Sequence, residues 1–186
     1  YKKIAKFKAD DVRVALKMGE MYERQDFTAE AKAEYQRAAA LLKREKKTKE
    51  LIALYERLIK LDRQDTKPRL ELADLYVQSR MTNEALDTLN DVAEDWIEAE
   101  RYEEAGRLLV QARELKESFP RTVANLMKIF RKRGKRKEAL SLVEDAVKKD
   151  KTNLDLWTLL GGLYLEEQSF KKAEEILTRI VTERPA

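Results

Sequence analysis

The chain has 186 residues, of which 43% are hydrophobic and 40% are charged, and its formal net charge is +4. With only 5 Gly and 3 Pro, it lacks the closely spaced turn residues of an all-β fold. Cys and His are absent, which excludes disulfides, thiolate or imidazole metal sites, and catalysis by either side chain. We therefore expect a helical, non-catalytic protein without metal or cofactor. No apolar run is long enough to span a membrane, and the lack of cysteine fits a cytoplasmic location.

The N-terminal two thirds repeat with a period of 54 residues. Residues 12–65 align without a gap with residues 66–119, which places Tyr22 over Tyr76 and Ala31 over Ala85. We expect each range to be a three-helix unit, in which segments 28–44 and 83–98 serve both as the second helix of one hairpin and as the first helix of the next. The same offset lays residues 1–11 over 55–65. The chain is therefore expected to begin inside a helix of a longer repeat protein, with residues 1–8 frayed.

Two further ranges, 120–153 and 154–186, repeat at 34 residues. The last of them carries a full motif, W-x2-L-G-x2-Y followed by A-x3-L and P, at Trp157, Leu160, Gly161, Tyr164, Ala173, Leu177 and Pro185. Six frames share a position that is small in five of them, at Gly19, Ala39, Ala73, Ala93, Met127 and Gly161, with spacings of 20, 34, 20, 34 and 34. This pattern resembles the tetratricopeptide repeat (TPR) family over essentially the whole chain.

The resemblance implies an all-α, right-handed solenoid of helical hairpins, with about ten antiparallel helices plus a partial N-terminal one. Turns are expected at Gly134 and where helices begin. Candidate N-cap residues are Thr66, Thr82, Thr152 and Ser169.

Charge is distributed unevenly along the repeats. Residues 82–118 carry 11 acidic and 4 basic side chains, and residues 120–151 carry 4 acidic and 11 basic ones. Neighbouring repeats of opposite sign attract each other, so this pattern fits either packing within the array or recognition of a charged partner.

The resemblance also indicates where a partner binds, because the first helices of such repeats line a groove. The expected partner-binding residues are Asn90, Glu94, Lys128, Arg131, Lys132, Gly162 and Leu165. We expect this groove to dock a peptide or helix of a partner protein that carries an acidic segment.

Two alternatives remain at this stage. Residues 128–137 hold seven basic residues in ten and suggest a nucleic-acid-binding repeat, although the acidic repeat beside them disfavours phosphates. The chain also fits a structural spacer within a larger repeat protein. The sequence does not indicate an oligomeric state.

Overall fold

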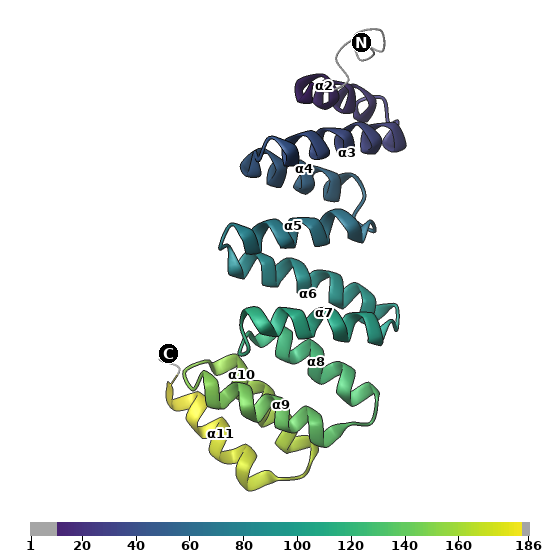
Figure 1. Cartoon of the computed structure of the whole chain (residues 1–186). Coiled ribbons are helices and arrows are strands. Elements are labelled where there is room, and N and C mark those ends of the chain that lie inside the picture. The colour runs from purple at the N-terminus through teal and green to yellow at the C-terminus, as the bar shows by residue number, and fades with distance from the viewer. Residues whose placement is uncertain (1–10, 184–186) are drawn as a thin grey trace. The chain divides into compact units, whose positions relative to one another are not determined.

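In the computed structural model, residues 11–183 are described, and they form ten α-helices joined by short turns (Figure 1). These described residues contain no strand. The predicted all-α class is therefore confirmed. The partial helix expected in residues 1–11 and the fraying expected of residues 1–8 fall on residues 1–10, outside the described part of the chain.

The chain divides into two compact units, Tyr1–Thr88 and Leu89–Ala186, which are considered separately. The boundary lies inside one helix, whereas the sequence repeats break at 65/66 and 119/120, so those repeat ranges remain predictions. The first unit contains α2 (Val12–Glu23), α3 (Thr28–Arg44), α4 (Thr48–Leu61), α5 (Thr66–Gln78) and the start of α6 (Thr82–Glu98). The second contains the rest of α6, α7 (Tyr102–Leu115), α8 (Pro120–Lys132), α9 (Arg136–Lys149), α10 (Leu154–Glu166) and α11 (Phe170–Glu183).

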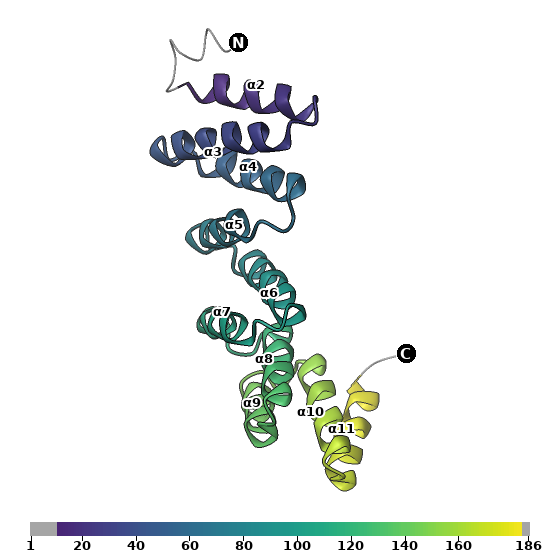
Figure 2. The same ribbon diagram turned by 90° about the vertical axis from the view of Figure 1, so that its right-hand side faces the viewer.

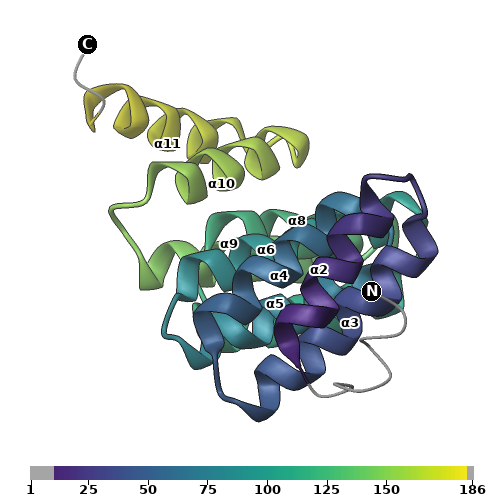
Figure 3. The same ribbon diagram turned by 90° about the horizontal axis from the view of Figure 1, so that it is seen from above.

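Consecutive helices pack against each other within each unit. In the first unit α3 contacts both α2 and α4, and α4 contacts α5 (Figure 2). In the second unit α8 contacts α7, α9 and α10, and α10 runs alongside α11 (Figure 3). The helices α3, α4, α8, α9 and α10 each pack against two or more others, so a single hairpin could not cover all their buried faces.

Six of the turns share one backbone geometry. Each contains a residue in the left-handed region, namely Asp26, Lys46, Arg80, Glu100, Gly134 and Gln168, with φ between 55° and 71°. The next N–H in each turn donates to the carbonyl five residues earlier at 2.7–3.0 Å, the bond that closes a Schellman motif. These residues recur at spacings of 20, 34, 20, 34 and 34, as the small positions do. Both α3 and α6 consequently lie between two such turns.

The helix starts correct three of the sequence predictions. Thr66 and Thr82 are first helical residues rather than N-caps, and Thr152 lies two residues before α10. Asp65 caps α5 instead, and its carboxylate accepts the N–H of Lys67 at 3.2 Å. Asn153 caps α10 in the same way, so an Asp or Asn next to Thr66 and next to Thr152 takes the role. Ser169 directly precedes α11, as expected.

Small residues set the distance between paired helices. The alanines that begin the second helices are completely buried: Ala31, Ala85, Ala105, Ala139 and Ala173. Gly19 on α2 lies against the buried ring of Tyr35 on α3, and a Cβ added to Gly19 would lie 2.4 Å from Tyr35 Cε1. Gly161 has a looser neighbour, since its added Cβ would lie 3.3 Å from Ile176 Cγ2.

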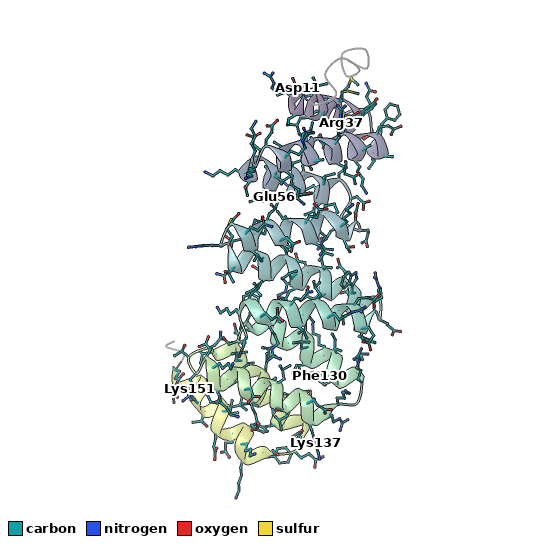
Figure 4. All side chains as sticks on the ribbon, in the orientation of Figure 1. Asp11, Arg37, Glu56, Phe130, Lys137 and Lys151 are labelled. Carbon is teal, nitrogen blue, oxygen red and sulfur yellow. The ribbon has the colours of Figure 1, made fainter. Side chains whose placement is uncertain are left out.

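Aromatic residues join successive helices through their hydroxyl groups. Tyr76 donates to Glu56 on α4 at 3.1 Å, and Tyr164 donates to Glu144 on α9 at 2.6 Å (Figure 4 labels Glu56). Each acceptor lies 20 residues before its tyrosine, on the preceding helix. Burial, together with the adjacent carboxylate, raises the pKa of Tyr164 to about 12. The ring of each tyrosine is thus buried while its polar end is satisfied.

We expect Gly19→Ala to destabilise the chain by roughly 1–3 kcal/mol, because the new methyl group must displace a buried ring. Gly106→Ala is the matched control. It also lies inside a helix, but its added Cβ meets nothing within 4 Å. The control should therefore stabilise the chain by about 0.5–1 kcal/mol through helix propensity. Urea unfolding of both variants tests whether the small residue at Gly19 makes the close contact with Tyr35. Equal stability of the two variants would contradict that contact.

Candidate functional site

The exposed part of the predicted binding surface lies on α8 and α10 in the second unit. Lys128, Arg131 and Lys132 are exposed on the last turns of α8. On α10, Gly162 and Leu165 are exposed. The two helices are in contact, and Arg131 Nη2 lies 2.9 Å from Glu166 Oε1 across them. The structure thus brings five of the predicted residues onto two neighbouring helices.

Asn90, another predicted residue, lies beneath this surface. It is fully buried, and its Nδ2 donates to Thr122 Oγ1 at 2.8 Å. Its Oδ1 accepts from Nδ2 of Asn125, which is also buried, at 3.0 Å. Asn90 therefore holds α6 against α8 and does not lie on the exposed surface.

Glu94 is half-buried within a network of charges between α6 and α8. Its carboxylate accepts from Arg121 at 2.7 and 2.9 Å and from Asn125 at 2.9 Å. Arg121 also donates to Asp91 at 2.6 Å. The hydrogen bond from Arg121, aided by Asn125 and by the charge of Lys128, lowers the pKa of Glu94. The same carboxylates raise the pKa of Arg121.

This network includes residues that the sequence prediction missed. Asp91, Thr122 and Asn125 were not among the expected site residues. The available signal was a pair of asparagines, Asn90 and Asn125, at positions where a helix in such an array would otherwise bury apolar side chains. Buried amides need partners, so their occurrence on adjacent first helices predicts a mutual contact.

Two cations on α8 form no salt bridge with another described residue. Lys128 Nζ approaches the Asn125 Oδ1 amide oxygen at 3.4 Å. Among residues 11–183, no carboxylate lies within salt-bridge distance of Lys128 or Lys132. Because they sit in the last two turns of α8, both lysines also favour the negative end of the helix dipole. That effect stabilises the helix and leaves their ammonium groups available to a carboxylate from outside.

A small hollow adjoins the Arg131–Glu166 pair. Its volume is about 230 Å³, and its lining comes from Arg131, Arg136, Ala139, Leu163, Glu166 and Glu167. It is smaller than most sites for drug-sized molecules and would admit about one side chain.

The basic segment 128–137 continues from α8 through the turn at Gly134 into α9. Phe130 is half-buried, whereas Lys135, Arg136 and Lys137 are exposed (Figure 4 labels Phe130 and Lys137). Arg133 forms a salt bridge with Glu103, with Nη2 of the arginine 2.6 Å from Oε1 of the glutamate. The segment therefore lacks an exposed aromatic ring on which a base could stack.

Residues 11–183 contain no group of three or more acidic side chains placed to hold a metal ion. Within the same range, no helix combines the length and apolarity needed to cross a bilayer.

We expect Glu94→Gln to cost about 1–2 kcal/mol of stability near neutral pH, because charge-assisted hydrogen bonds are lost. The folded-state pKa of Glu94 is lowered from its ordinary value of 4.5, so its contribution is present above 4.5 and is lost as the pH falls through the folded value. Urea unfolding near pH 7 and near pH 3 should show the difference from wild type shrinking in acid. Exposed Glu174→Gln is the control, with little effect at either pH. A cost for Glu94→Gln that does not change with pH would contradict this role.

A comparison with known protein families finds a match in the C-terminal region. The family model described as tetratricopeptide repeat matches residues 130–186. No curated protein matches the chain.

The solved structures with a similar fold include proteins described as TPR proteins. YrrB, described as a TPR protein with an unusual peptide-binding site, is 22% identical, with 82% of this chain and 86% of that chain covered and a TM-score of 0.46. A TPR protein from Parabacteroides merdae is 14% identical; the match covers 94% of this chain and 80% of that chain, with a TM-score of 0.47. The pilF protein of Pseudomonas aeruginosa is 17% identical; the match covers 94% of this chain and 77% of that chain, with a TM-score of 0.46. By the family match, residues 130–186 of the chain are similar to tetratricopeptide repeats.

Proposed function

We propose that this chain is a non-catalytic interaction scaffold that docks a peptide or helix of a partner protein on the surface formed by α8 and α10. The observation that carries the proposal is the pair of exposed lysines, Lys128 and Lys132, without a carboxylate partner in the described residues. Tetratricopeptide repeats serve in general as protein-interaction scaffolds, which supports the broader part of this statement.

The charges on α8 favour a partner with acidic residues. An exposed lysine gains little from the fold itself, and a partner's carboxylate adds attraction that raises the association rate and sets specificity. Neighbouring Arg131 and Arg121 already have carboxylate partners, so they contribute less to such recognition.

The α10 surface favours an apolar contact beside these charges. Leu165 keeps 46% of its surface exposed. Three residues before it, Gly162 has open space where a side chain would lie. A partner's apolar side chain could therefore approach the α10 backbone closely and cover Leu165, which removes apolar surface from water.

The two alternative functions receive less support. A nucleic-acid site would place phosphates near Asp91, Glu94 and Glu166, whose negative charges oppose them. A spacer role would not require free lysines next to an exposed leucine. Protein docking uses both features.

Synthetic peptides of about twelve residues, varied in acidic, basic and leucine content, provide the test by fluorescence anisotropy. We expect acidic, leucine-containing peptides to bind and Lys128→Glu with Lys132→Glu to weaken that binding at least about tenfold. The matched control is Lys137→Glu with Lys171→Glu, which makes the same change in net charge at exposed positions elsewhere. Arg131 is left intact, since a glutamate there would face Glu166 and disturb the fold.

Equal binding by wild type and the Lys128/Lys132 variant would refute this docking surface. Equal loss in the control would show that only net charge matters. If single-stranded nucleic acid binds more tightly than the acidic peptides and with a steeper dependence on salt, the nucleic-acid alternative is correct.

A further inference from the structure

The first unit contains a trough between α3 and α5. Both α3 and α5 pack against α4, yet α3 and α5 do not contact each other. In the second unit the corresponding helices α8 and α10, which both pack against α9, do touch. The separation of α3 from α5 leaves the side of α4 between them uncovered.

Two hollows occupy this space. The larger has a volume of about 380 Å³ and is lined by Leu42, Lys43, Lys46, Lys47, Thr48, Leu51, Tyr55, Glu71, Asp74, Leu75 and Gln78. The smaller has a volume of about 280 Å³ and is lined by Gln36, Ala39, Ala40, Lys43, Tyr55, Leu58, Lys67, Pro68 and Glu71. We call the two together the α3–α5 trough.

A single side-chain contact divides the trough. The hydroxyl of Tyr55 on α4 donates to the carboxylate of Glu71 on α5, and both residues line both hollows. Burial and this carboxylate raise the pKa of Tyr55, so the hydroxyl keeps its proton and the bridge persists at neutral pH. The trough is thus two adjacent sockets separated by a fixed ridge.

The floor of each socket is apolar. Leu42, Leu51 and Leu75 are buried under the larger socket. Leu58 and Ala39 are buried under the smaller one. Each socket therefore suits one apolar side chain of a ligand.

The rim carries cations that the fold does not neutralise. Lys43, Lys46 and Lys67 have no carboxylate within salt-bridge distance among the described residues, whereas Lys47 pairs with Glu45 at 2.8 Å. Lys43 borders both sockets. Acidic residues on either side of the two apolar ones would therefore meet a lysine at each end of the trough.

The α5 wall favours an extended ligand over a helical one. Asp74 is exposed and Gln78 lies one turn beyond it, so this wall presents oxygen acceptors to the larger socket. An extended segment has free backbone N–H groups to donate to them, whereas a helix has already used its own.

We propose that the α3–α5 trough binds an extended peptide segment in which two apolar side chains, one in each socket, are flanked by acidic residues. This site is separate from the α8–α10 surface and does not depend on it. Its occupant is a partner segment of this chemistry.

The probe is the fluorescein-labelled peptide Glu-Glu-Leu-Ser-Leu-Glu-Glu, added to the whole chain with methyl groups labelled for NMR. We expect saturable binding with shifts of the Leu42, Leu51 and Leu75 methyl signals. The peptides with lysine for glutamate, or with serine for leucine, should bind at least about tenfold more weakly.

Two variants test the rim and the socket separately. Lys43→Glu with Lys46→Glu should weaken binding about tenfold, against a control of Lys49→Glu with Lys60→Glu at exposed positions outside the trough. Ala40→Leu should fill the smaller socket and weaken binding similarly. Its control is Ala53→Leu, which is exposed on α4 and lines neither socket. Neither substitution falls at a buried position, so the fold should survive and circular dichroism can verify it.

Shifts confined to Leu165 would overturn the trough proposal while supporting the α8–α10 surface. Absence of saturable binding at millimolar peptide would also overturn it. Binding that Ala40→Leu and the lysine variant leave unchanged would show that the peptide binds elsewhere.

Discussion

The structure depends on close contact between helices whose apolar faces cannot be covered by one partner alone. A helix of about 14 residues is marginal in water, so its stability must come from the helices packed against it. Fully buried alanines at the start of five second helices, and Gly19 against Tyr35, allow the backbones to approach far enough for that burial. The surfaces that stay exposed are those that this packing leaves uncovered.

The contacts between helices then determine which faces stay open. The left-handed turn residues follow the 20- and 34-residue spacing of the small positions, so α3 is entered through Asp26 and left through Lys46. In the first unit α3 does not contact α5, whereas in the second unit α8 contacts α10. The α3–α5 trough lies where α3 and α5 stay apart in the first unit, and the α8–α10 surface lies where α8 and α10 touch in the second.

The sequence predicted what depends on periodicity and missed what depends on individual side chains. Six frames of small and aromatic residues predicted the helices, and only one turn, at Gly134, had a glycine to mark it. The predicted caps Thr66 and Thr152 were wrong because Asp65 and Asn153, one position away, are equally good cap residues, and composition alone does not choose between neighbours. The positions of Lys128, Lys132 and Leu165 on exposed faces follow from helical phase. The burial of Asn90 does not, because it depends on an amide pairing with Asn125 across two helices.

The central claim is that each helix is stabilised mainly by its immediate neighbours. Hydrogen exchange of Ala139→Leu, followed by mass spectrometry at peptide resolution, tests it most directly. Overpacking at this buried contact should accelerate exchange in α8 and α9, while α2 and α3 keep their wild-type protection. Acceleration of the same size in all the described helices would show that the chain unfolds as one cooperative body and would contradict the account.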